Sequence, residues 1–96
     1  MKTWFVSRHP GALKWLAAQD LIVDEQVAHL DPAVITAGDR VIGNLPIHLA
    51  AEVCARSGEY WHLSMDIPHN LRGQELSYEQ MQACKVELRR FMLHPC

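Results

Sequence analysis

The stretch TWFVSRHPG, residues 3–11, decides the fold of this chain. Residues 4–6 form a short run of strand-forming apolar side chains, and this run ends abruptly at a polar turn, residues 7–9. Pro10 suits the first turn of a helix, because proline has no N–H group that would need a partner there. The stretch therefore predicts a strand, a polar turn and a helix. A hydroxyl, a guanidinium and an imidazole would then lie beside the free N–H groups of a helix start, which favours an anionic ligand and phosphate above all.

The composition of the chain predicts one small folded domain. The 96 residues are 49% hydrophobic, which indicates a globule with a modest core rather than a disordered chain. The formal net charge of −2 predicts no general attraction to DNA or long RNA, so an anionic ligand would be small and held by a local cluster. Neither a signal-peptide pattern nor an apolar run of about 20 residues occurs. We therefore expect a soluble cytoplasmic protein that makes no membrane contact.

The spacing of cysteines and histidines argues against a metal site. Cys54, Cys84 and Cys96 are widely spaced and form no CxxC motif, so we expect neither a disulfide scaffold nor a zinc knuckle. Cys54 and Cys84 are predicted to be reduced residues that pack in helices. The six histidines show no HxH, HxxxH or HExxH spacing, which predicts no metal and no cofactor. The fingerprints of serine hydrolases, dinucleotide sites and P-loops are also absent.

The rest of the chain divides into short strands and helices at clear turn signals. The elements predicted after the first strand are a helix at residues 10–19, strands at 26–30 and 40–42, a helix at about 44–57, a strand at 60–65 and a helix from residue 77. Asn44 would cap the middle helix, and Gly58 would supply the left-handed residue after it. Residues 31–39 leave room for one helical turn at most and include Gly38-Asp39, a turn signal.

The last helix is opened by a capping-box pattern, in which Ser77 is followed three residues later by Gln80. Apolar residues then repeat at helical spacing and would face the core: Met81, Cys84, Leu88, Phe91 and Met92. The polar segment 66–76 before this helix is expected to be a surface connection. The alternative is a lid over a ligand, with Arg72 reaching it.

This order of elements predicts a Rossmann-like, three-layer α/β fold in a single domain, residues 1–96. The sheet would be mainly parallel and four-stranded, in the order 2-1-3-4, with helices on both faces. The chain steps from its first strand outward to the second and returns past the first to the third. This reversal leaves a crevice between the C-terminal ends of the first and third strands, where open α/β sheets bind ligands. The loops at residues 7–11 and 43–48 would flank the crevice.

The two loops and the strand after them supply a candidate site. Its predicted members are Ser7, Arg8, His9, Gly43, Asn44, His48, Ser64 and Asp66. Arg8 can hold a phosphate through two parallel hydrogen bonds. His9 and His48 carry imidazoles that titrate near neutral pH, so either can move a proton. Gly43 would let the backbone approach a ligand closely.

These residues also have structural interpretations. In these interpretations Ser7 is simply a helix cap, Arg8 is a solvated charge, and the loop imidazoles are surface or structural groups. His29 and His62 lie in predicted strands among apolar neighbours, and we interpret both as hydrogen-bonded structural histidines.

A resemblance to a known family rests on five segments of the chain: TWFVSRHPGA, VAHLDP, GDRVIGNLPIHLAAEVC, YWHLSMD and RGQEL. They are similar to a small family of CRISPR-associated proteins of the Csx group, whose members accompany type III CRISPR systems. The likeness covers nearly the whole chain. Each segment is short, but their combination is specific.

The resemblance implies a compact Rossmann-like homodimer that acts as a ring nuclease. Ring nucleases linearise cyclic oligoadenylate, the second messenger of type III interference, and so switch off the effectors that it activates. The resemblance favours cyclic tetra-adenylate as the substrate. Of the candidate site residues, the resemblance carries over to five only: Ser7, Arg8, His9, Asn44 and His48. The helix at 44–57 is apolar around much of its circumference, which agrees with a dimer interface.

Three other functions stay open at this point. The first is a sponge or sensor that binds cyclic oligoadenylate without cleaving it. The second is a subunit that docks on CRISPR machinery through an exposed apolar patch and binds no nucleotide. The third is a nuclease that acts on long RNA, which the net charge of −2 disfavours.

Overall fold

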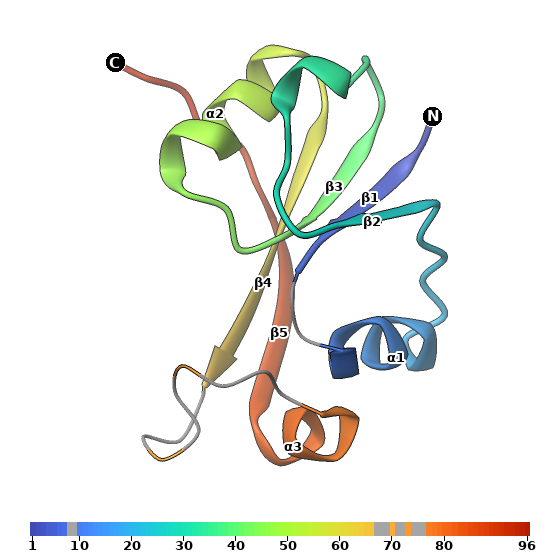
Figure 1. Ribbon diagram of the computed structural model, residues 1–96. Coiled ribbons are helices and arrows are strands. Elements are labelled where there is room, and N and C mark those ends of the chain that lie inside the picture. Colours follow the sequence, from blue (N-terminus) through green and yellow to red (C-terminus); the bar gives the residue numbers. More distant parts are fainter. Residues whose placement is uncertain (8–9, 67–69, 71–72, 74–76) are drawn as a thin grey trace.

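The computed structural model describes residues 1–7, 10–66, 70, 73 and 77–96, and within them five strands form one sheet (Figure 1). The strands are β1 (Thr3–Val6), β2 (Glu25–Val27), β3 (Arg40–Gly43), β4 (Glu59–Asp66) and β5 (Lys85–Phe91). The helices are α1 (Pro10–Ala18), α2 (Ile47–Ala55) and α3 (Tyr78–Ala83), with a short 3₁₀ turn, η1 (Pro32–Val34). The α/β class expected from the sequence is confirmed.

The sheet has the order β2-β1-β3-β4-β5, so its first four strands follow the predicted order. The pairs β1–β2, β1–β3 and β3–β4 are parallel. Successive strand residues face opposite sides of the sheet, and each side has its own core. One core joins α1 and α3 to the sheet through Phe5, Ala12, Leu16, Ile42, Leu63, Met81 and Cys84. The other joins α2 and η1 to the opposite face through Leu30, Ile35, Val41, Leu45, Ala50, Val53 and Tyr60.

The fifth strand corrects the prediction of a long C-terminal helix. The capping box at Ser77 is confirmed, but α3 ends at Ala83, and β5 then pairs antiparallel with β4 over seven register pairs. The helical repeat predicted through Met92 is therefore wrong beyond α3. Val86 and Leu88 are half-buried between exposed charged neighbours, so the segment also fits the alternation of a strand. Pairing with the open edge of β4 satisfies backbone groups of the extended chain, and this favours the strand.

Three smaller predictions are also corrected. Asn44 does not cap α2, because the cap position is Pro46, in an extended conformation and without a side-chain hydrogen bond. The left-handed residue after α2 is Ser57, with φ 63°, and not Gly58. β2 ends before His29, which is exposed rather than part of a strand.

The carboxylate of Asp39 ties together the N-terminal ends of β1 and β3, and the residue is only 2% exposed. It accepts hydrogen bonds from the Lys2 N–H (2.9 Å), the Thr36 N–H (3.1 Å) and the indole N–H of Trp4 (3.2 Å). Burial by itself raises the pKa of Asp39, but these donors outweigh it and lower the pKa to about 2. The carboxylate is therefore ionised and bonded throughout the neutral range.

The helices α1 and α3 lie side by side at the end of the molecule away from α2 (Figure 1). Their backbones come close together at Gly11, where a Cβ atom would lie 2.2 Å from both the Ser77 carbonyl carbon and the Tyr78 nitrogen. The Lys14 ammonium also lies 5.2 Å from the centroid of the Tyr78 ring, within the range of a cation–π contact. The start of α1 therefore packs directly on the start of α3, and only glycine fits at the contact.

Replacing Ser77 with alanine is expected to lower the free energy of unfolding by about 1 kcal/mol. The Ser77 hydroxyl accepts the Gln80 N–H (3.2 Å), and the Gln80 side-chain oxygen accepts the Ser77 N–H (3.0 Å), so the change removes one half of the capping box. Urea denaturation followed by circular dichroism measures the loss. Unchanged stability would show that packing alone holds α3.

Candidate functional site

The candidate site lies where β1 and β3 end side by side. Val6 and Gly43 are register partners, so the loops that follow them start next to each other. The helix after β1 packs on one face of the sheet and the helix after β3 packs on the other, which makes this edge the switch point of the topology. The structure thus brings the starts of the two loops together, as expected. The predicted members Arg8 and His9 lie outside the described residues.

Gly43 has a structural reason to be glycine. A Cβ atom at this position would lie 2.8 Å from the Val6 carbonyl oxygen and 3.2 Å from the Val6 Cβ. The residue is buried between β1 and β4, next to His62 in the register. Close packing of β3 against β1 thus requires the absence of a side chain, whereas the predicted approach to a ligand stays a prediction.

The remaining loop residues differ in exposure. Ser7 is half-buried, and its N–H donates to the Val27 carbonyl oxygen at 3.1 Å. Asn44 and His48 are exposed. His48 lies on the side of α2 opposite to the buried Ala50 and Val53, since these follow it by about half a turn and about one and a half turns. The structure therefore places the His48 imidazole in solvent rather than against the sheet.

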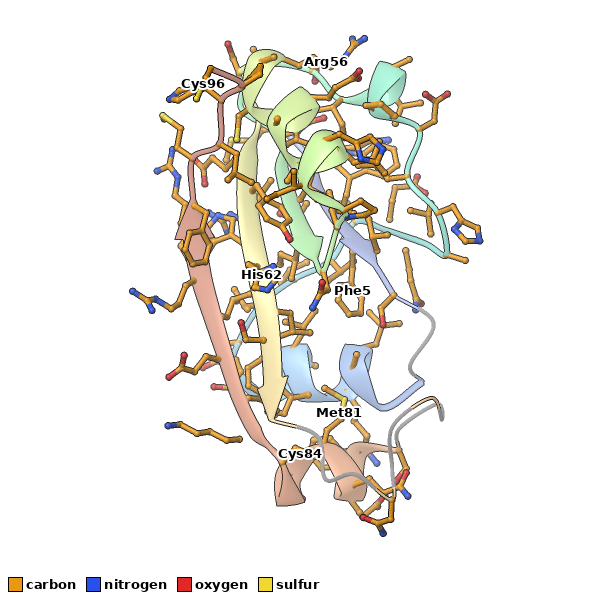
Figure 2. All side chains as sticks on the ribbon, turned by 90° about the vertical axis from the view of Figure 1, so that its left-hand side faces the viewer. Phe5, Arg56, His62, Met81, Cys84 and Cys96 are labelled. Carbon is orange, nitrogen blue, oxygen red and sulfur yellow. The ribbon has the colours of Figure 1, made fainter. Side chains whose placement is uncertain are left out.

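A tyrosine and a histidine on β4 form a hydrogen-bonded pair under the loop that follows β3. The hydroxyl of Tyr60, which is 3% exposed, lies 2.7 Å from Nδ1 of His62. The same hydroxyl accepts the Leu45 N–H (3.0 Å) and lies 3.3 Å from the Gly43 carbonyl oxygen. His62 is half-buried, and Figure 2 shows it on β4 below α2. The pair therefore joins β4 to the start of the second candidate loop.

The Tyr60 hydroxyl can serve both protonation states of His62. Burial raises the pKa of Tyr60, although the Leu45 N–H opposes the shift, so the hydroxyl stays protonated at neutral pH. Its one proton can point to Nδ1 of a neutral imidazole. When the imidazolium donates from Nδ1 instead, the hydroxyl proton can turn to the Gly43 carbonyl. Neither state leaves the buried hydroxyl without a partner.

The strand β5 adds charged and aromatic side chains around His62. Arg89 is the register partner of His62, and its guanidinium carbon lies 5.7 Å from the centroid of the Phe91 ring. The His62 and Phe91 rings meet edge to face, with centroids 5.9 Å apart. Two residues further along β4, the half-buried Ser64 is paired with the exposed Glu87. An imidazole, a guanidinium and a hydroxyl thus share one sheet face next to the switch point, with one carboxylate beside them.

The interpretation of His62 as a structural residue explains only part of its environment. Its bond to Tyr60 is that of a hydrogen-bonded strand histidine, but the register also places it beside Gly43, at the candidate site. The sequence alone could have placed His62 next to Tyr60, since residues two apart in a strand share a face. The sequence does not show how β3 and β4 are aligned, so it could not place His62 beside Gly43.

The cysteines and the other metal-ligating side chains of the described residues form no metal site. The cysteines Cys54, Cys84 and Cys96 are free. In the described ranges, no group of three or more His, Cys, Asp or Glu side chains could hold a metal ion. Within the same ranges, none of the helices has the length and apolarity needed to cross a bilayer. The side chain of Asp66, also predicted near the site, is not among those described.

The fold and the site define a small doubly wound α/β domain with two polar loops and a tyrosine–histidine pair at its switch point. A family model described as "Putative CRISPR-associated protein (Cas_VVA1548)" matches residues 4–94. The chain therefore belongs to this CRISPR-associated family. The match includes both candidate loops and all of β5. No curated protein and no solved structure gives a match.

Proposed function

We propose that this CRISPR-associated protein is a ring nuclease that binds and linearises cyclic oligoadenylate, with cyclic tetra-adenylate as the favoured ring. One observation carries the proposal: the loops after β1 and β3 start side by side at the switch point, where open α/β sheets bind nucleotides. The CRISPR-associated family and the resemblance to ring nucleases of type III systems support the choice of ligand.

Cleavage of such a ring needs alignment more than added reagents. Each phosphate of an oligoadenylate has a neighbouring ribose 2′-OH, whose attack on phosphorus expels the 5′-oxygen and leaves a 2′,3′-cyclic phosphate. Fixed alignment of nucleophile, phosphorus and leaving group can lower a barrier by at most about 7–11 kcal/mol. A well-placed donor to the developing negative charge contributes about 3–4 kcal/mol. These effects require no metal ion, and they suffice for the slow turnover that ends a signal.

The loop residues divide the work as follows in this proposal. Arg8 holds the scissile phosphate and stabilises its charge. Ser7 and Asn44 orient phosphate or ribose. His9 or His48 transfers a proton, and the exposed position of His48 leaves it free to meet a ligand bound over the start of α2. A homodimer is part of the proposal, because two sites related by a two-fold axis would match the symmetry of the ring.

Incubation of the purified protein with cyclic tetra-adenylate in EDTA should yield linear products ending in 2′,3′-cyclic phosphate. Arg8→Ala is expected to lower the single-turnover rate about 10²–10³-fold, because it removes the donor that stabilises the developing charge. Arg56→Ala is the matched control, since Arg56 is exposed near the C-terminal end of α2 (Figure 2). Chromatography and mass spectrometry of the nucleotide identify the products, and cyclic hexa-adenylate tests ring size.

The outcomes separate the remaining functions. Tight binding with an intact ring would identify a sponge or sensor instead of an enzyme. Neither binding nor cleavage of any ring would favour a docking subunit. An Arg8→Ala protein that cleaves at the wild-type rate would remove the first loop from the site.

A further inference from the structure

We propose that His62, positioned by Tyr60, is the general base that takes the proton from the attacking 2′-OH, and that Arg89 binds the adjacent phosphate. This inference rests on the proposed function and deepens it. The proposed function assigns one proton transfer to a loop histidine, His9 or His48. Cleavage moves two protons, one from the 2′-OH and one to the leaving 5′-oxygen, so a second imidazole has a defined task.

The location of His62 meets the first requirement for a base. It lies beside Gly43 in the register, at the strand end from which the second candidate loop starts. Its side chain shares a sheet face with Tyr60 and Ser64, and Figure 2 shows it on β4 below α2. A ligand held by the two loops at the switch point would therefore meet this face.

The hydrogen bond to Tyr60 meets the second requirement, because it fixes which nitrogen can react. Nδ1 lies 2.7 Å from the Tyr60 hydroxyl, so Nε2 is the nitrogen that can face a ligand. Among the described residues, no hydrogen bond to Nε2 is seen. In the tautomer that carries its proton on Nδ1, this N–H donates to the Tyr60 oxygen and the Tyr60 hydroxyl donates to the Gly43 carbonyl oxygen, 3.3 Å away. Nε2 then has a free lone pair and can take a proton without changing either bond. Tyr60 therefore acts as a positioning residue that keeps both states of the imidazole bonded.

The charges around His62 suit a phosphodiester. Arg89 faces it from β5 as its register partner, and Glu87 lies two residues earlier on the same face of that strand. On α2, the Cys54 thiol lies 4.0 Å from the Phe91 carbonyl oxygen, and the buried residues of the helix are the apolar Ala50 and Val53. Arg89 is exposed and can turn to a phosphate oxygen, forming paired hydrogen bonds.

The chemical step balances without a metal or a co-reactant. The 2′-oxygen forms a bond to phosphorus while its proton passes to Nε2 of His62. The bond between phosphorus and the 5′-oxygen breaks, and the 5′-oxygen takes a proton from the imidazolium of His9 or His48. The products are a 2′,3′-cyclic phosphate and a 5′-hydroxyl, and exchange of protons with water restores both imidazoles.

The test compares His62→Asn with His29→Asn, a matched change of an exposed histidine beyond β2. Asparagine can keep a polar atom near Nδ1 and so retain the bond to Tyr60. We expect His62→Asn to bind cyclic tetra-adenylate with wild-type affinity but to cleave it about 10²–10⁴-fold more slowly. The wild-type rate should fall as pH falls and imidazole is protonated, and this acid limb should vanish in the variant.

Two further variants keep the inference falsifiable. Tyr60→Phe should displace the acid limb and lower the rate less than His62→Asn does, and Arg89→Gln should weaken ring binding. Thermal melts verify folding, and His62→Gln replaces His62→Asn if the latter does not fold. A wild-type rate and pH profile in the His62 variant would overturn the inference and leave the ring nuclease in place. A wild-type protein that cleaves no ring would overturn both.

Discussion

Replacing Asp39 with alanine is expected to lower the free energy of unfolding by about 3 kcal/mol, because three donors lose the acceptor they share in a buried site. These donors are the Lys2 and Thr36 N–H groups and the Trp4 indole N–H. Against the opposing effect of burial, hydrogen bonds lower the pKa of the buried carboxylate, so they carry the effect. Urea denaturation at neutral pH, followed by tryptophan fluorescence and circular dichroism, measures it.

The Asp39 carboxyl also predicts how stability depends on pH. Its folded pKa of about 2 lies below the ordinary value of 3.8, so folding favours the ionised form. The corresponding stability, about 2 kcal/mol, is fully present above pH ~4 and is lost as pH falls toward 2. Asp39→Asn is the control, because it keeps one oxygen acceptor but cannot titrate. If the stability of Asp39→Asn fell as steeply between pH 4 and 2 as that of the wild type, other carboxyl groups would be responsible.

The second large effect is expected at the contact between α1 and α3. Gly11→Ala should lower the free energy of unfolding by about 2 kcal/mol, because the new Cβ would meet the backbone of Ser77 and Tyr78 at 2.2 Å. The clash involves backbone atoms, so side-chain rotation cannot relieve it. Alanine at an open helix position would instead stabilise by about 1 kcal/mol.

Ala17→Gly is the control that measures the effect of helix propensity alone on the free energy of unfolding, since Ala17 is an exposed residue of the same helix. It should destabilise by about 1 kcal/mol, the reverse of the effect expected for glycine-to-alanine at an open site. Both variants are measured by urea denaturation. A stabilised Gly11→Ala protein would show that α1 and α3 separate without cost.

Most of the fold could be predicted from local sequence patterns. The apolar run at residues 4–6, the proline at residue 10 and the capping box at Ser77 each act within a few neighbours, and each predicted element start is observed. The order expected for the first four strands is observed, and the rule that crossovers between parallel strands are right-handed then predicts the helices on both faces.

The C-terminal strand could not be predicted because its residues fit two periods. Leu88 lies seven residues after Met81, which suits a helix, yet it also alternates with charged neighbours, which suits a strand. The choice depends on the open edge of β4, a tertiary feature. The same limit applies to Asp39, where the pair Gly38-Asp39 indicated a turn but not a buried carboxylate serving three donors.

The candidate site was only partly accessible to sequence reasoning. The two loops were found because loops after parallel strands lie at one sheet edge, and the pairing of Val6 with Gly43 agrees with this. His62 was assigned a structural role because strand residues show no register in the sequence. Its position beside Gly43 and opposite Arg89 depends on two pairings that only the assembled sheet defines.

The central position of β1 has a consequence for how the molecule folds. Thr3 pairs with Arg40 and Trp4 with Glu25, so the first strand finds both neighbours only after long loops have closed. Closing such loops costs entropy before any contact repays it, which slows folding relative to helical proteins of similar size. β2 pairs only with β1, and β1 joins it to the rest of the sheet. The sheet should therefore form and melt as one cooperative unit.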